Sequence, residues 1–321
     1  MPAGATSDAE IVTLRSFSSG AGVAETKAGT MTSKITEVQL LTEVGRGGPD
    51  AITLRAHIDE TFTIGPKVHG GSLQMVVAKA ARTALTALTP PPGLDGGDPK
   101  LAEATAAMIP VAIASDYLTA PDAADVDLAI SVRKRGRTVT VLQVDAVQQG
   151  RTVVSSSVTM ARPDTGTPHH SGPNALDGTP AEPPSTGITL DGSPIAEVNH
   201  LGAAIDLVLD AETFPMVRGE TGEPLVRGWI RPKGLDPDEY FSVLVCDISP
   251  PVVFNLAMFG WAPTVQLTTY VRRHPAPGWL RFAALSTEVG PGMFEEDHLV
   301  VDSTGTVVAQ SRQLALIPAG R

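Results

Sequence analysis

The sequence predicts an α+β fold made of two tandem repeats, each with a long central helix wrapped by a curved antiparallel sheet. Two apolar segments with helical spacing begin near residues 69 and 236, and strand-like segments separated by tight turns follow each of them. A segment rich in Pro, Gly, Thr and Ser separates the two sets. One helix packed on one curved sheet buries the apolar surfaces of both elements in two layers.

The first central helix is expected to begin after His69. The sequence His69-Gly70-Gly71 leads into apolar residues at helical spacing that continue to Leu88. A glycine pair leaves the backbone N–H groups of the first turn without side-chain cover, and such groups hold negative charge. Two interpretations stay open for the glycines, close packing or ligand contact. For His69 the alternatives are a structural role at the helix entry and contact with a ligand.

The second central helix is expected to begin at Asp236. Asp236 suits the N-cap, Pro237 the first helical position and Glu239 the third position of a capping box. The following residues are almost wholly apolar, and helical spacing places Asp247 on the same face as Leu244. A buried carboxylate needs hydrogen-bond donors, and such groups concentrate at functional sites. The alternative is an acid at a frayed helix end, bonded to nearby backbone.

Strands are expected to fill the rest of both repeats. Apolar alternation and turn residues predict them at residues 35–43, 51–64, 109–119, 126–134, 138–148 and 152–161, and at residues 203–209, 225–230, 264–272, 280–289, 296–301 and 307–316. Short turns at residues 135–137 and 149–151 make the strands that they join antiparallel neighbours.

Two pairs of similar segments indicate an internal duplication. Tyr117-Leu-Thr-Ala-Pro is similar to Tyr270-Val-Arg-Arg-His-Pro, at an offset of 153 residues (270 − 117). The segment around Val153 is similar to that around Val307, at an offset of 154 residues (307 − 153). Nearly equal offsets are typical of a repeated unit. Two such units can join edge to edge, which also hides their edge strands.

The duplication predicts a domain organisation. Residues 1–34 are interpreted as a flexible leader, residues 35–163 as the first repeat, residues 164–195 as a linker and residues 196–318 as the second repeat, which carries the candidate catalytic residues. Counted from the two helix starts, the position that matches Asp247 in the first repeat is Ala80. We therefore expect one active site per chain.

Composition narrows the class of function. The single cysteine, Cys246, excludes an intrachain disulfide and fits a reducing cytoplasm, which is the predicted location. No apolar run is long enough to span a membrane and no secretory signal is evident. A formal net charge of -11 argues against binding nucleic acid or an anionic membrane surface. Assembly of several chains into a homo-oligomer is compatible with the sequence.

No metal site or resident cofactor is predicted. The histidines lack metal-ligand spacing, and neither glycine-rich phosphate-binding pattern occurs. Arg272 and Arg273 are interpreted as solvated residues at a strand end, with contact to a phosphate group as the alternative.

The order of several short motifs resembles one family. His69-Gly70-Gly71 is similar to its glycine-pair helix entry. Similar segments follow in order, namely Arg135-Gly-Arg-Thr-Val, Gln149-Gly-Arg-Thr-Val-Val, Asp247-Ile-Ser-Pro-Pro-Val-Val-Phe-Asn-Leu, Gly260-Trp-Ala-Pro-Thr-Val and Val308-Ala-Gln-Ser-Arg-Gln. The chain resembles the TesB-like acyl-CoA thioesterases, and this resemblance implies a double hotdog fold. Residues 266–270 depart from the family's best-known bacterial members, so the acyl chain preference stays open.

The resemblance implies a catalytic set of Asp247, Thr264 and Gln313, which hold a water molecule that attacks the thioester of acyl-CoA. It also implies that the backbone N–H groups of Gly70 and Gly71 polarise the thioester carbonyl. A positioned base suffices for such an activated ester without a covalent nucleophile. Coenzyme A enters as part of the substrate.

Two other functions are weighed against hydrolysis. Hotdog folds also host enoyl-CoA hydratases, which the resemblance associates with an Asp and a His about five residues apart, and no histidine follows Asp247 at that spacing. A non-catalytic acyl- or acyl-CoA-binding protein would keep the same pocket. Thr264 and Gln313, taken alone, are also typical of ordinary polar residues in strands.

Overall fold

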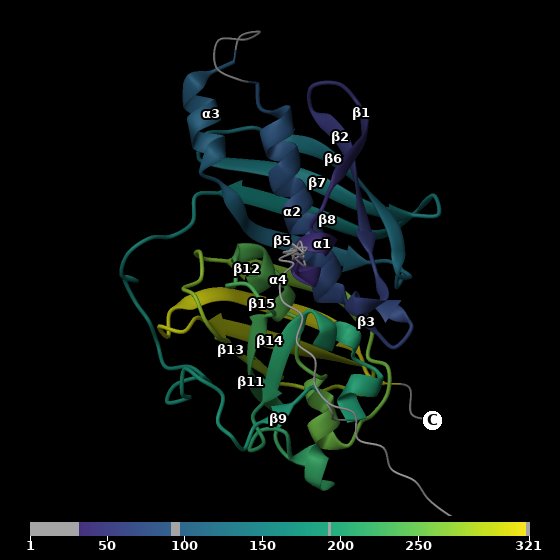
Figure 1. Ribbon diagram of the computed structural model, residues 1–321, viewed down its shortest axis with the longest axis vertical. Coiled ribbons are helices and arrows are strands. Elements are labelled where there is room, and N and C mark those ends of the chain that lie inside the picture. Colours follow the sequence, from purple (N-terminus) through teal and green to yellow (C-terminus); the bar gives the residue numbers. More distant parts are fainter. Residues whose placement is uncertain (1–31, 91–96, 192–193, 319–321) are drawn as a thin grey trace, which may run out of the picture. The chain divides into compact units, whose positions relative to one another are not determined.

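The computed structural model describes residues 32–90, 97–191 and 194–318, which belong to one compact unit that begins at Thr32. The predicted leader, residues 1–34, lies almost wholly outside the described residues. Figure 1 shows the elements in chain order.

The first half of the chain consists of antiparallel strands and one long helix. Its elements are α1 (Lys34–Val38), β1 (Thr42–Arg46), β2 (Ala51–Ile58), the 3-10 helix η1 (Glu60–Phe62), β3 (Thr63–Ile64), β4 (Lys67–Val68), α2 (Gly70–Leu88), α3 (Pro99–Ala106), β5 (Ile109–Tyr117), β6 (Ala124–Lys134), β7 (Val139–Gln148) and β8 (Arg151–Ala161).

The second half has a similar order of elements, with a shorter central helix. Its elements are β9 (Ile188–Thr189), η2 (Pro194–Glu197), η3 (His200–Ala203), β10 (Ile205–Leu209), η4 (Pro215–Arg218), β11 (Leu225–Pro232), α4 (Glu239–Val245), η5 (Val252–Leu256), β12 (Thr264–Val271), β13 (Leu280–Leu285), β14 (Met293–Val301) and β15 (Val307–Leu316).

The strand order confirms the two tandem repeats. A 13-stranded sheet runs β1-β2-β6-β7-β8-β5-β12-β15-β14-β13-β11-β10-β9. Read outward from the β5–β12 junction, the order β5-β8-β7-β6-β2-β1 in the first half matches β12-β15-β14-β13-β11-β10 in the second. The two sequence offsets fit this match, because they pair β5 with β12 and β8 with β15. The halves join edge to edge through antiparallel pairing of β5 with β12.

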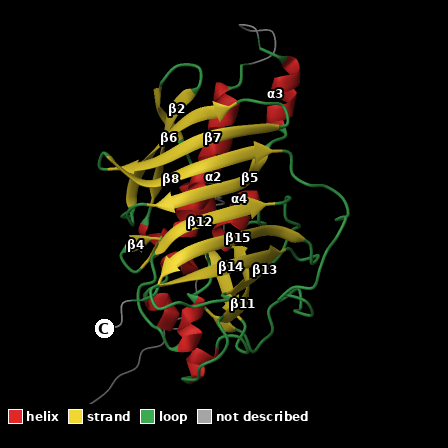
Figure 2. Ribbon diagram, turned by 180° about the vertical axis from the view of Figure 1, so that it is seen from behind, coloured by secondary structure: helices red, strands yellow, loops and turns green. Residues whose placement is uncertain are grey.

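Both central helices pack on the same side of the sheet, and Figure 2 shows the strands lying across α2 and α4. Helix α2 begins as predicted: His69 is its N-cap, and the imidazole accepts a hydrogen bond from the backbone N–H of Ser72. Its 19 residues bury Met75, Val76 and Leu85 completely. A helix of that length and burial draws its stability from tertiary packing rather than from intrinsic propensity.

Helix α4 differs from its prediction. It has seven residues, and its N-cap is Asp238 rather than Asp236. The Asp238 carboxylate accepts from the backbone N–H of Phe241 at 2.7 Å, so the cap lies two residues later than the sequence pattern indicates. Counted from the observed caps, the position in α2 that matches Asp247 is Ala78 instead of Ala80, and it is fully buried and apolar.

Other elements also differ from their prediction. The strand expected at residues 51–64 ends at Ile58 and is followed by η1. Residues 35–43 were expected to be a strand, but Ile35 and Val38 are buried three residues apart, which is one helical turn, and they form α1. Strand β1 then begins at Thr42. Helix α3, capped by Asp98 with Pro99 in its first turn, has too few apolar residues to give a periodic signal.

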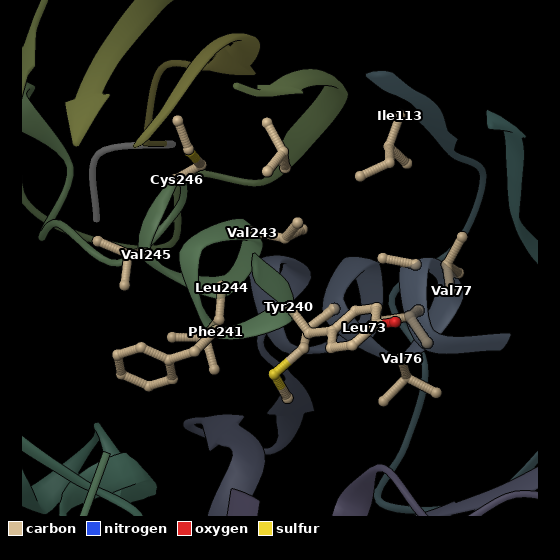
Figure 3. Packing of buried hydrophobic residues seen from close by; sticks show 14 of the residues in the cluster. Leu73, Val76, Val77, Ile113, Tyr240, Phe241, Val243, Leu244, Val245 and Cys246 are labelled. Carbon is tan, nitrogen blue, oxygen red and sulfur yellow. The ribbon is translucent and has the colours of Figure 1, made fainter. Parts of the chain in front are cut away.

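The two central helices pack against each other. Figure 3 shows side chains of α4, including Tyr240, Val243 and Leu244, beside Leu73 and Val76 of α2. The closest approach is at Gly71, where a Cβ atom would lie 2.7 Å from the carbonyl oxygen of Leu244 and 2.8 Å from Cβ of Asp247. Only glycine therefore fits where the start of α2 crosses the end of α4.

We expect Gly71→Ala to lower the free energy of unfolding by about 2 kcal/mol, because the added methyl group meets backbone and a Cβ atom that cannot rotate away. Urea denaturation measures the change. The matched control is Gly292→Ala, where a Cβ atom would meet nothing within 4 Å. Equal stability of the two variants would contradict the close approach.

Candidate active site

Asp247 lies at the end of α4 and is held by the opposite repeat. Its backbone N–H still bonds to the carbonyl of Leu244 at 3.2 Å, which continues the helical turn past Val245. Its side chain exposes 9% of its surface. The Oδ2 atom accepts a hydrogen bond of 2.7 Å from the backbone N–H of Gly71, at the positive end of α2. The predicted burial of this carboxylate is confirmed.

His69 connects the same two helix ends through its ring. Nδ1 accepts from the backbone N–H of Ser72, at 3.2 Å, and lies 2.9 Å from the Ser72 hydroxyl. Because an N–H can only donate, Nδ1 must be unprotonated, and the ring proton lies on Nε2. Nε2 then donates to the backbone carbonyl of Asp247 at 2.7 Å. His69 thus positions the backbone that carries the carboxylate.

The two glycines present their N–H groups differently. The N–H of Gly71 is occupied by Asp247. The N–H of Gly70 has no hydrogen-bond partner within the described ranges, while its carbonyl accepts from the Tyr117 hydroxyl at 2.9 Å. A Cβ atom at residue 70 would lie 2.8 Å from Oδ2 of Asp247. Close packing therefore requires both glycines, and one of their N–H groups stays available.

Thr264 and Gln313 meet each other on adjacent strands. Strand β12 begins at Thr264 and pairs with β15, which carries Gln313. The Thr264 hydroxyl donates to Oε1 of Gln313 at 2.9 Å, and Gln313 is 7% exposed. Between the described residues, no direct hydrogen bond joins Asp247 to either of these side chains.

Glu296, on β14, was not predicted as a site residue. It lies opposite Gln313 in the strand register, and the Gln313 side chain, as a hydrogen-bond donor, opposes the rise of its pKa. Its Oε1 accepts from the Ser249 hydroxyl at 2.7 Å, and its Oε2 accepts from the backbone N–H of Val252 at 3.0 Å. The side chain exposes 1% of its surface.

His298 completes this buried polar group. Its side chain is fully buried, and Nε2 lies 3.1 Å from the Ser249 hydroxyl and 3.5 Å from Oε1 of Glu296. Burial lowers the pKa of His298 to about 3, so the imidazole is neutral. Its Nδ1 has no partner among the described residues.

The structure thus gathers the site residues into two adjoining groups. The helix-entry group consists of His69, Gly70, Gly71, Tyr117 and Asp247. The strand group consists of Ser249, Thr264, Glu296, His298 and Gln313. One residue separates Asp247 from Ser249 along the chain, and the charge of Asp247 acts on Glu296.

Burial makes both carboxyl groups weaker acids than usual. The pKa of Asp247 is raised by burial, against the opposing effects of His69 and of the Gly71 N–H. The pKa of Glu296 is raised to about 7, mainly by burial, while its hydrogen-bond donors oppose the shift and Asp247 adds to it. A carboxylate with a raised pKa is a stronger base, which suits proton abstraction from water near neutral pH.

A signal for Glu296 and His298 is present in the sequence. Strand β14 alternates from Met293 to Val300, and Phe294, Glu296, His298 and Val300 share its buried face. An acid and an imidazole on the apolar face of a strand indicate a functional site, just as an acid on the apolar face of a helix does.

Among the described residues, no group of three or more His, Cys, Asp or Glu side chains is arranged to hold a metal ion. None of the helices in the same part of the chain is long and apolar enough to cross a membrane.

The fold and the site define a double hotdog protein with a buried carboxylate where its two central helices meet. Comparison with known families identifies it further. The acyl-CoA thioesterase N-terminal domain matches residues 58–161, and the acyl-CoA thioesterase C-terminal domain matches residues 173–317. The chain belongs to this acyl-CoA thioesterase family.

Several relatives and solved structures are similar to this chain over most of its length. An uncharacterized protein of Mycobacterium tuberculosis is 37% identical over 289 residues, which cover 85% of this chain and 94% of that protein. A crystal structure from Thermobifida fusca, described as a candidate thioesterase II, has 26% identity and a TM-score of 0.72, and the match covers 91% of this chain and 99% of that one. An acyl-CoA thioesterase II, TesB2, from Mycobacterium marinum shares the fold, with a TM-score of 0.58 at 16% identity over 89% of this chain and 98% of that one.

The raised pKa of Glu296 predicts that the stability of the folded protein depends on pH. Because its folded pKa, about 7, lies above the usual value of 4.5, the folded chain holds the proton more tightly than the unfolded chain. This group's contribution is therefore fully present below pH 4.5 and is lost as the pH rises through 7. We expect Glu296→Gln to gain on the order of 3 kcal/mol relative to the parent protein between pH 4.5 and pH 8.

Urea denaturation at several pH values measures this difference. Glu295→Gln, on the opposite face of the same strand, is the control and should track the parent protein at every pH. A difference between Glu296→Gln and the parent that does not change with pH would contradict the raised pKa.

Proposed function

We propose that the chain hydrolyses acyl-CoA to a free acid and coenzyme A by direct attack of a water molecule held by Asp247, Thr264 and Gln313. The observation that carries this proposal is the Asp247 carboxylate, which is buried and fixed by the Gly71 N–H. Membership of the acyl-CoA thioesterase family supports the substrate class.

The capacity of each group fits the proposed role. Asp247 has one carboxylate oxygen engaged by Gly71, which leaves the other to accept a proton from water. Thr264 donates to Gln313 and keeps its lone pairs, and Gln313 keeps a second N–H. These three groups can orient one water molecule by accepting and donating on different sides of it.

The proposed reaction needs no covalent intermediate. Asp247 takes a proton from the water, and the hydroxide oxygen bonds to the thioester carbonyl carbon. The bond from carbon to sulfur then breaks, and the proton passes to the departing thiolate. The developing oxyanion would be stabilised by the Gly70 N–H, the unpaired donor of the glycine pair.

Two alternative functions share the fold, and an assay of thiol release from acyl-CoA distinguishes them from hydrolysis. A hydratase would remove the enoyl absorbance of an unsaturated acyl-CoA without releasing thiol. A non-catalytic binding protein would retain acyl-CoA with neither change. Cytoplasmic location, assembly into homo-oligomers and the absence of a resident cofactor stay predictions.

Asp247→Asn tests the base. We expect the rate of thiol release from acyl-CoA to fall by about 10²–10⁴-fold, because the amide cannot take the proton. Acyl-CoAs of graded chain length and a thiol reagent provide the measurement. Asp206→Asn, which removes a carboxylate paired with Arg231 at the surface, should keep the parent rate. Undiminished thiol release by Asp247→Asn would refute the proposal.

Thr264→Val tests the hydroxyl at nearly constant volume. We expect kcat to fall about tenfold or more with little change in KM, because the hydroxyl acts on the water rather than on the bound substrate. Thr264→Ser should retain most of the rate. Thr268→Val, which changes a residue of the same strand outside both site groups, is the control. Equal kcat values for all these variants would exclude a role of the Thr264 hydroxyl.

A further inference from the structure

We propose that Glu296 is a positioning residue of the hydrolytic site, whose carboxylate fixes the orientation of the Gln313 carboxamide. This inference rests on the proposed function, because Gln313 matters here as a residue that orients the attacking water. It assigns a role to a buried acid that the proposed reaction does not otherwise use.

The carboxylate of Glu296 is itself held in place. Both of its oxygens accept hydrogen bonds from the segment that follows Asp247, one from the Ser249 hydroxyl at 2.7 Å and one from the Val252 N–H at 3.0 Å. Its side chain is 1% exposed, so water does not compete for these donors. A carboxylate anchored in this way is a rigid partner for Gln313 across the strand pair.

A carboxamide needs such a partner to have one orientation. Its oxygen accepts and its nitrogen donates, and the two ends are nearly equal in size. The Thr264 hydroxyl, which contacts Oε1 of Gln313, can donate or accept and so does not choose between the two orientations. An ionised carboxylate only accepts, so it requires the amide nitrogen of Gln313 to face Glu296 and the oxygen to face Thr264.

Protonation of Glu296 would remove this selection. A carboxylic acid can both donate and accept, so it pairs with either end of the Gln313 amide. The titratable groups that face Glu296 within the described residues are Asp247 from the end of α4 and His298 on its own strand. His69, from the start of α2, contacts Asp247 at 3.6 Å.

Because the pKa of Glu296 is raised to about 7, its ionised form prevails only above that pH. We therefore expect kcat of the parent protein to fall as the pH drops through about 7. The two coupled acids, Asp247 and Glu296, share this acid limb of the profile.

The first experiment compares Glu296→Gln with the parent protein over pH 5 to 9. Glutamine keeps the shape and can still bond to Ser249 and Val252, but its amide accepts and donates like that of Gln313. We expect kcat to fall about 10- to 100-fold at pH 8, with KM changed by less than about twofold. The acid limb should also move to lower pH by about one unit or more. Glu295→Gln is the matched control and should keep the parent kcat and the parent profile.

The second experiment asks whether Glu296 acts through Gln313. In the Gln313→Ala background, adding Glu296→Gln should cost less than about twofold in kcat, because the amide that it orients is gone. Two losses that multiply would overturn the inference, as would an unchanged kcat and acid limb in Glu296→Gln. The profile of the parent protein serves as a test that needs no variant: the absence of an acid limb near pH 7 also overturns the inference.

The outcomes separate this inference from the function on which it rests. No thiol release by the parent protein on any acyl-CoA tested overturns both. Thiol release that is lost in Asp247→Asn but unaffected by Glu296→Gln overturns only the role of Glu296.

Discussion

The hydrogen bond from the Gly71 N–H to the Asp247 carboxylate is the contact on which the site depends. It joins the first turn of α2, from one repeat, to the end of α4, from the other, over 2.7 Å. The contact requires an approach that only glycine allows, since a Cβ atom at residue 71 would overlap the backbone of Leu244. Neither repeat alone contains this arrangement. The duplication therefore creates the site as well as the continuous sheet.

Two buried acids within one site are costly unless the fold supplies donors for both. Asp247 receives the positive end of a 19-residue helix, while Glu296 receives a hydroxyl, a backbone N–H and a carboxamide. Each set of donors comes from an element that must be packed correctly for the site to form. Ionisation of the two acids is thus coupled to the tertiary structure, because burial raises both pKa values and the charge of Asp247 adds to the rise at Glu296.

The sequence predicted the parts of the fold that depend on local patterns. The start of α2 at His69, the hairpin strands and the burial of Asp247 follow from spacing over a few residues. The cap of α4 was misplaced because two aspartates flank Pro237, and only packing selects Asp238. The alternation of β14 indicates that Glu296 is buried, but the groups that hold its carboxylate, Ser249 and Val252, lie 47 and 44 residues away in sequence, and no local pattern places them there.

Differences between matched residues of the two repeats explain why a duplicated chain has one such site. Antiparallel pairing places the end of β5 beside the start of β12, so Tyr117, which bonds to the Gly70 carbonyl, and Thr264 belong to the same end of the junction. The duplication matches Tyr117 with Tyr270, but Tyr270 is 48% exposed. The position in α2 that matches Asp247 is the buried Ala78. Each of these differences removes a component that a second site would need, so the two-fold symmetry of the sheet does not extend to the chemistry.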